Sequence, residues 1–132
     1  MPVYRCYSPK GLLTASAKTQ IADEITTIHT SATGAPELYV NVVFREIAEG
    51  DCFVARKPAT HSYLFGLIRR GRDLDTRQAM LREFSRMWAR ITGQSEAEFL
   101  VALSEADPAN TMEAGLILPV PVSSSPTSVS GV

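Results

Sequence analysis

The chain has 132 residues, of which 45% are hydrophobic, and a formal net charge of −1; this length allows one domain with a hydrophobic core. Acidic and basic residues are scattered, so there is no broad basic surface for a phosphate backbone, and we do not expect nucleic acid as a partner. There is no signal-peptide pattern, and no apolar run approaches the roughly 18 residues of a membrane span, so we expect a cytoplasmic protein without a membrane partner.

The first half of the chain predicts a strand, a helix and a second strand. Residues 3–7 and 39–44 are short β-branched and aromatic runs bounded by turn residues, which is typical of strands. Between them, residues 14–33 begin with a Ser/Thr cap candidate and end before Gly34. Apolar residues recur at helical spacing in this segment and need a sheet to cover. They are Ala17, Ile21, Ile25, Ile28 and Ala32.

The second half predicts the same order of elements. Residues 62–68 and 99–103 have strand character, and residues 73–92 form a helical pattern that begins with an aspartate and ends before Gly93. The two helix starts are 59 positions apart, and so are the two terminating glycines. This constant spacing predicts two similar units, although their residues show little identity. The apolar stripe of the second helix consists of Leu81, Phe84, Trp88 and Ile91.

These elements predict an α/β (α+β) fold with one domain over residues 1–122. A strand, a helix and a strand make a right-handed parallel crossover, so two units, at about 2–58 and 61–119, can share one four-stranded sheet with both helices on one face. The other face of the sheet would be bare, and its apolar residues would need a partner, so we expect oligomerisation. Residues 123–132 have no periodicity and little to bury, and we expect a disordered tail.

Pro2 is the first residue that suggests chemistry. If Met1 is removed, Pro2 carries a free secondary amine, and an α-amino group has an ordinary pKa of about 7.7 to 8.0. Burial or nearby cations lower that pKa toward the operating pH of an efficient acid or base. Many proteins begin with Met-Pro for no catalytic reason, so this pair alone does not establish a site.

A cationic turn follows the third predicted strand. Strand alternation sends Arg69 and Arg70 to opposite faces, and Gly71 lets the turn bring Arg72 back beside Arg69. Two guanidinium groups placed in this way suit a carboxylate, which arginine holds bidentately. A solvated turn before a helix is the plainer interpretation of the same residues.

Four further residues have an ordinary structural interpretation when taken singly. His29 lies in the last turn of the first helix, where a histidine is usually a core or cap group, and Glu113 has the surroundings of a surface carboxylate. Cys6 and Cys52 form no Cys-x-x-Cys motif, and no pair of histidines has ligand spacing, so we expect no metal site and no disulfide. Both cysteines are interpreted as packing residues.

Several short segments together resemble a known family. They are Pro2-Val3-Tyr4, Ser16-Ala17-Lys18 through Ala22, Ile25-Thr26 with His29, Val42-Val43-Phe44-Arg45-Glu46, Arg69-Arg70-Gly71-Arg72 and Met112-Glu113-Ala114-Gly115. In their order and spacing they resemble the cis-3-chloroacrylic acid dehalogenase group of the tautomerase superfamily, over residues 2 to about 119. The resemblance implies a homotrimer in which the bare sheet faces pack together in a barrel, and it calls for no metal or organic cofactor.

The resemblance also implies a role for each of five residues. Pro2 would be the catalytic acid or base, and Arg69 and Arg72 would bind the substrate carboxylate. His29 would help to hold and polarise the substrate, and Glu113 would activate water. The partner would be a small keto-enol or α,β-unsaturated carboxylic acid.

The sequence departs from this family at Ala102, where the dehalogenases have a tyrosine that assists the glutamate. An alanine methyl group can neither hydrogen-bond nor help to deprotonate water. Ala114 and Leu116 stand where a tyrosine and an arginine are usual, so we expect a more apolar pocket rim. The tyrosines that could compensate from elsewhere are Tyr4, Tyr39 and Tyr63.

We therefore expect a cofactor-independent tautomerase that uses Pro2. A hydratase or dehalogenase of 3-substituted acrylates, with Glu113 activating water, is the first alternative. The second is a trimeric binding or signalling module without enzymatic activity, which retention of Met1 would favour because an amide nitrogen is not usefully protonated.

Overall fold

The computed structural model describes residues 1–119, so the tail predicted for residues 123–132 lies outside the described residues. Four strands form one sheet in the order β2-β1-β5-β6. The strands are β1 (Val3–Pro9), β2 (Asn41–Ile47), β5 (Ser62–Arg69) and β6 (Phe99–Ala106). The β1–β2 and β5–β6 pairs are parallel, and β1 and β5 are antiparallel in the centre. The predicted sheet of two β-α-β units is thereby confirmed.

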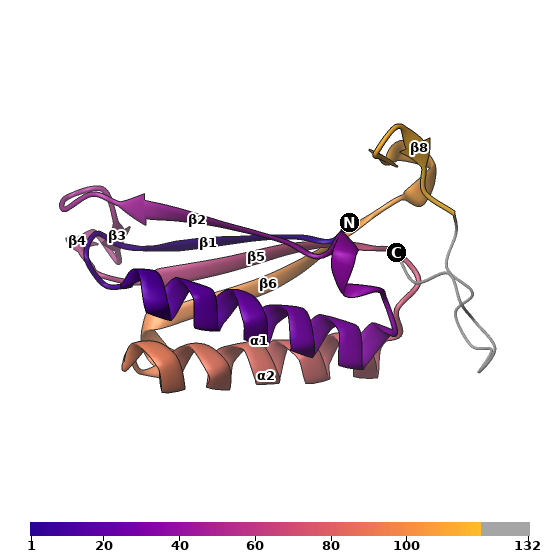
Figure 1. Cartoon of the computed structure of the whole chain (residues 1–132). Helices are drawn as coiled ribbons and strands as arrows, with labels where there is room; N and C mark the ends of the chain where they lie inside the picture. Colours follow the sequence, from indigo (N-terminus) through magenta and orange to yellow (C-terminus); the bar gives the residue numbers. More distant parts are fainter. Residues whose placement is uncertain (120–132) are drawn as a thin grey trace.

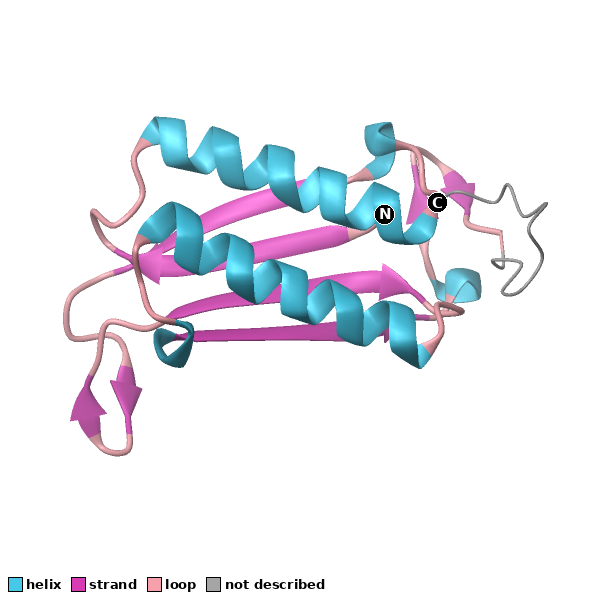
Figure 2. Ribbon diagram, turned by 90° about the horizontal axis from the view of Figure 1, so that it is seen from below, coloured by secondary structure: helices cyan, strands magenta, loops and turns pink. Residues whose placement is uncertain are grey.

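Two long helices, α1 (Ala15–Thr33) and α2 (Leu74–Thr92), cover one face of this sheet side by side (Figures 1 and 2). Their inward residues and those of the inner strands form one buried cluster, as the helical periodicity predicts. Its members are Tyr4, Cys6, Leu13, Ile21, Ile25, Ile28, Leu64, Ile68, Met80, Phe84, Met87 and Trp88.

The ends of both helices are where the sequence predicts them. Side-chain oxygens of Thr14 and Asp73 accept hydrogen bonds from first-turn backbone N–H groups, at 3.0 and 2.8 Å. Gly34 and Gly93 follow the last turns with φ angles of 74° and 80°, a left-handed conformation that glycine adopts without strain.

The outer strands begin or end differently from the prediction. Residues Glu37–Tyr39 form a short 3-10 helix, so β2 begins at Asn41 rather than at Tyr39. The last strand continues to Ala106 instead of ending at Leu103.

Two hairpins that the sequence did not predict lie at opposite ends of the sheet (Figure 1). Each pairs two strands of only two residues, which are too short to show an alternating pattern. The hairpins are β3 (Phe53–Val54) with β4 (Lys57–Pro58), and β7 (Met112–Glu113) with β8 (Leu116–Ile117).

Within residues 1–119, no helix lies over the second face of the sheet (Figure 1). Val42, Val101 and Ile68 pack into the core, so their neighbours on each strand point to the other face. On that face Val43, Leu67 and Leu100 are 41%, 38% and 48% exposed. No helix within residues 1–119 is both long and apolar enough to cross a membrane.

A buried polar network joins the end of α2 to β5. Oε1 of Gln94 accepts hydrogen bonds from Oγ of Ser62 at 2.7 Å and from Nε1 of Trp88 at 2.8 Å. The Trp88 ring also stacks on Phe99, with centroids 4.8 Å apart. Nε2 of Gln94 donates to the carbonyl oxygen of Thr60 at 2.9 Å, so this buried amide has partners at both ends.

Candidate functional site

The N-terminus meets the β7–β8 hairpin at one end of the sheet (Figure 1). The Met1 amino group donates a hydrogen bond to the Glu113 carboxylate. Pro2 is fully buried, and its carbonyl oxygen accepts hydrogen bonds from the backbone N–H and Nδ2 of Asn41, at 3.0 and 3.2 Å. The hairpin thus brings Glu113 to the start of the chain.

The N-terminal amine is less basic than an exposed α-amino group. Burial, and then the positive charge of Arg69, lower its pKa from 8.0 to about 6, even with Glu113 beside it. Both causes disfavour the protonated amine, which is therefore largely neutral near pH 7.

Arg69 and Arg72 lie near each other, and the charge of Arg69 acts on this amine. Arg69 at the end of β5 is 2% exposed, whereas Arg70 is 59% exposed and pairs with Asp107 at 3.4 Å. Burial, and then the charge of Arg72, lower the pKa of Arg69 to about 10. Gly71, with a φ angle of 124°, makes the turn between Arg69 and Arg72.

Arg72 has a hydrogen-bond donor that no residue within 1–119 uses. Its Nη1 donates to the Thr33 carbonyl oxygen at 3.4 Å, while its buried Nε has no hydrogen-bond partner among residues 1–119. Burial lowers the pKa of Arg72 as it does that of Arg69. Two adjacent, partly desolvated guanidinium groups favour an anion between them.

His29 points from α1 into the same end of the core. It is 2% exposed, and its Nδ1 lies 2.6 Å from the Tyr4 hydroxyl oxygen. Burial, followed by the charges of Arg72 and the N-terminal amine, lowers the pKa of His29 to about 4. His29 is therefore a neutral imidazole near pH 7.

Two residues at this end were not assigned a role from the sequence. The sequence suggests Tyr4 only as a substitute phenol and gives no reason to single out Asn41. Asn41 lies here because it pairs with Val3 in the β1–β2 register, and a single extended run does not reveal its register. Nδ2 of Asn41 is also 3.4 Å from the Glu113 carboxylate.

Ala102 lies away from the residues just described. It pairs with Phe65 in the middle of β6 and points to the face without helices, since Val101 and Leu103 pack into the core. Tyr63 does not compensate at the N-terminal end either, because its hydroxyl group lies 3.4 Å from Sγ of Cys52.

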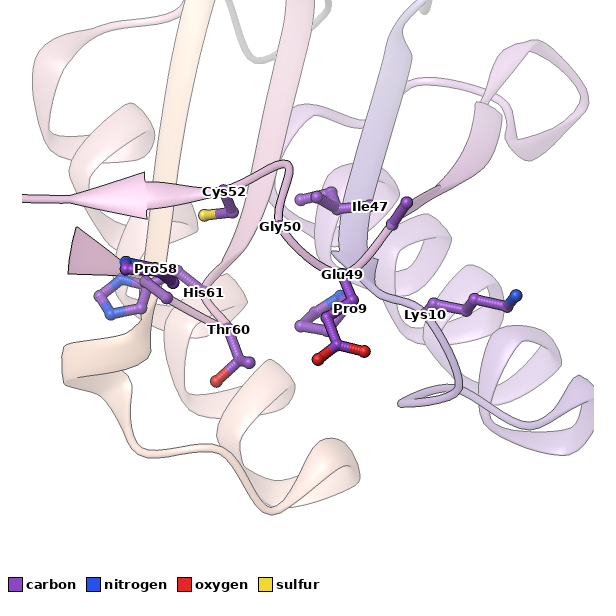
Figure 3. Close-up of a pocket in the computed structure, with 11 residues that line it drawn as sticks. Pro9, Lys10, Ile47, Glu49, Gly50, Cys52, Pro58, Thr60 and His61 are labelled. Carbon is purple, nitrogen blue, oxygen red and sulfur yellow. The ribbon is translucent and has the colours of Figure 1, made fainter. Parts of the chain in front are cut away.

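A cavity of about 460 Å³ opens at the opposite end of the sheet (Figure 3). Its lining includes Lys10, Glu49, Cys52 and His61, and none of the five residues singled out from the sequence. Cys52, expected to be a packing residue, is only half-buried here, whereas Cys6 is buried in the core. The cavity is therefore separate from the group of residues around the N-terminus.

A protein-family model matches almost the whole chain. It is Tautomerase_3, described as "Putative oxalocrotonate tautomerase enzyme", and it matches residues 1–129. No curated protein sequence matches the chain.

Solved structures of similar proteins cover most of the chain. The structure of native Ps01740 is 37% identical, covers 84% of this chain and 99% of its own, and has a TM-score of 0.83. N1, a member of the cis-3-chloroacrylic acid dehalogenase family, is 27% identical, covers 91% of this chain and 85% of its own, and has a TM-score of 0.87. A fused 4-OT, solved as a symmetric trimer, is 20% identical, covers 87% of this chain and 94% of its own, and shares the fold with a TM-score of 0.81.

Proposed function

Because the chain belongs to the Tautomerase_3 family, we propose that it is a cofactor-independent tautomerase that acts through the amine of Pro2 after removal of Met1. Its substrate would be a small keto-enol or α,β-unsaturated carboxylic acid. The observation that carries this proposal is the gathering of the N-terminus, Glu113, His29, the buried Arg69 and the half-buried Arg72 at one end of the sheet.

The properties of the N-terminal amine support a role in proton transfer. Burial and Arg69 hold the pKa of the Met1 amine at about 6, and the same two causes would act on the amine of Pro2. A neutral amine can accept the hydroxyl proton of an enol, and the ammonium group so formed can return a proton to carbon. An amine with a pKa near the working pH serves in both directions.

The arginines support the choice of an acidic substrate. A carboxylate held by Arg69 and Arg72 would place the adjoining carbonyl close to the N-terminus, and the same positive charges would stabilise the enolate as it forms. His29, neutral and beside Arg72, is suited to hydrogen-bond a substrate oxygen.

We also propose that the protein assembles as a homotrimer through the sheet face that has no helix. Val43, Leu67 and Leu100 are exposed on that face, and burial of such a patch favours association. The fused 4-OT with this fold is a symmetric trimer.

The first prediction tests the role of Pro2 with phenylpyruvate as the substrate. Intact mass should show that Met1 is absent, and Pro2→Ala should lower kcat/KM by about 100-fold or more, as loss of a positioned acid or base typically does. Arg69→Ala and Arg72→Ala should mainly raise KM. Each variant should lose about 1.5–3 kcal/mol of substrate-binding free energy, which is typical of a lost hydrogen bond to a charged group. Arg70→Ala is the matched control, because Arg70 is exposed, and it should leave both constants unchanged.

Full activity in Pro2→Ala, or in a protein that retains Met1, would contradict the proposal. Retained Met1 without activity would favour a trimeric binding module instead.

A second candidate function is hydration or dehalogenation of 3-substituted acrylates. It is favoured by the similarity to N1, a member of the cis-3-chloroacrylic acid dehalogenase family, and by the position of Glu113 beside the N-terminus. Assays of the same native protein with both substrates decide between the two functions. Faster turnover of cis-3-chloroacrylate than of phenylpyruvate would make hydration or dehalogenation the principal activity.

A further inference from the structure

We propose that Tyr4 is a positioning residue of this site, whose hydroxyl group donates a hydrogen bond to Nδ1 of His29 and so holds the proton of the neutral imidazole on Nε2. The assignment of the proton rests on the geometry and on the charges around the pair, and needs no assumption about activity. Its use in catalysis rests on the proposed function.

The side chains of Tyr4 and His29 contact each other in the interior of the protein. Oη of Tyr4 and Nδ1 of His29 are 2.6 Å apart, and both residues are almost completely buried, at 0% and 2% exposure. Their rings also meet edge to face, with centroids 5.6 Å apart. The imidazole therefore has one orientation in which Nδ1 faces the phenol.

The direction of this hydrogen bond follows from the partners available. If Nδ1 were the donor, the hydroxyl hydrogen of Tyr4 would need a second acceptor, and no other hydrogen bond of this hydroxyl is found within residues 1–119. A buried hydroxyl hydrogen without an acceptor is unfavourable. When Tyr4 donates, its single hydrogen is satisfied.

The surrounding charges favour the same direction. The groups that act on His29 are the Tyr4 hydroxyl from β1, Arg72 from the turn before α2, and the N-terminal amine. The positive charge of Arg72 also acts on Tyr4, so the oxygen lone pairs are better directed to Arg72 and the hydrogen to Nδ1. Burial and these cations oppose an imidazolium, which leaves the neutral form.

A neutral imidazole that accepts at Nδ1 must carry its hydrogen on Nε2. Among residues 1–119 no hydrogen bond of Nε2 is found, so this N–H remains available for an oxygen of a bound acid. His29 would then act as a hydrogen-bond donor to the substrate rather than as a base. Proton removal is left to the N-terminal amine.

The second prediction concerns the ring nitrogens of His29, observed by long-range ¹H–¹⁵N NMR of the uniformly labelled full chain. Near neutral pH, Nε2 should be protonated and Nδ1 unprotonated. The chain has two histidines, so a His61→Gln variant assigns the signals. A proton on Nδ1, or an imidazolium, would overturn the proposal.

The matching variant is Tyr4→Phe, which keeps the ring contacts with His29 and with Phe84 and removes only the hydroxyl group. The single tautomer should become a mixture, and the pKa of His29 should rise because the neutral form loses its hydrogen bond. With phenylpyruvate, kcat should fall by about tenfold with little change in KM. Tyr7→Phe, on the same strand but the opposite face, is the control and should change none of these.

Unchanged tautomer and unchanged kcat in folded Tyr4→Phe would overturn the positioning role. Since the NMR measurement needs no substrate, it separates this inference from the proposed function. The predicted tautomer in a protein without tautomerase activity would uphold the pairing of Tyr4 with His29 and refute the proposed activity.

Discussion

His29 combines near-complete burial with the electrostatic influence of Arg72 and of the N-terminal amine. The imidazole gives up its proton at a pKa of about 4 in the folded chain, against an ordinary 6.5. The neutral form is thus the one that the fold stabilises. Any condition that protonates the unfolded chain, but not the folded one, must weaken folding.

The third prediction gives this effect a sign and a size. Between pH 6.5 and about 4 the unfolded state binds the proton and the folded state does not, so the free energy of unfolding should fall as the pH is lowered through that window. The contribution of His29 is about 3 kcal/mol, at 1.36 kcal/mol for each pH unit. Urea unfolding at fixed protein concentration measures it.

Two glutamine variants identify the residue responsible. His29→Gln should flatten the pH dependence over this window, whereas His61→Gln should leave its slope as it is. Equal slopes in the native protein and in His29→Gln would show that another group is responsible.

The grouping of the candidate residues was easier to propose from the sequence than the contacts among them. Pro2, Arg69, Arg72 and Glu113 could be proposed from residue types and from a family resemblance, and the structure brings all four to one end of the sheet. The Tyr4–His29 hydrogen bond could not be predicted, because it depends on how α1 is rotated over β1. Such a rotation is a tertiary property that helical periodicity determines only to within a face.

At the level of elements, one glycine of β5 leaves space for a large side chain of β1. Gly66 is paired with Tyr4 across the two strands. A β-carbon at position 66 would lie 2.5 Å from Cε1 of Tyr4 and 2.8 Å from Cδ2 of Leu103. The missing side chain makes room for the Tyr4 ring, as a glycine within a strand often does for a close neighbour.

The fourth prediction is that Gly66→Ala destabilises the fold. Overpacking of a core costs about 1–3 kcal/mol, and here the ring that must move is the one held by His29. Chemical denaturation should show the loss. In a Tyr4→Ala background the same substitution should cost clearly less, because the ring is gone; an equal cost in both backgrounds would contradict the steric explanation.

Elements were predictable where their signals are local. The caps and apolar stripes of both helices lie within the segments themselves, and so their ends were predicted correctly. The two hairpins were missed because strands of two residues carry no pattern, and Tyr39 was assigned to β2 because an aromatic residue before Asn41 resembles a strand residue.

At the scale of the whole molecule, the two β-α-β units are similar, but no single sequence offset aligns all of their strands. Val42 and Val101 match at a spacing of 59, but their partners in the sheet, Tyr4 and Leu64, are 60 apart. On the inner strands, therefore, Ser62 and not His61 is the counterpart of Pro2. The nitrogen of Ser62 is part of a peptide bond, and its side chain is bound into the buried network of Gln94, so no second site of this kind is expected in the second unit.

The fifth prediction concerns assembly. Chains of 14.4 kDa should sediment as a trimer, and Leu100→Lys should shift the protein toward monomers because it puts a charge into the proposed interface. Leu74→Lys is the matched control: Leu74 is 55% exposed, against 48% for Leu100, but lies on α2 in the other layer. Sedimentation velocity distinguishes the species, and a native monomer, or equal dissociation by both variants, would contradict the proposed interface.

Trp88 gives the molecule a built-in optical label. It is the single tryptophan of the chain, and it contacts Phe99 and Gln94 within the second unit, so tryptophan fluorescence, excited selectively, reports on the surroundings of that unit. Circular dichroism, by contrast, averages over both helices. Unfolding curves from the two signals will coincide if the halves of this duplicated fold melt as one, and will separate if the half that carries the amine loosens first.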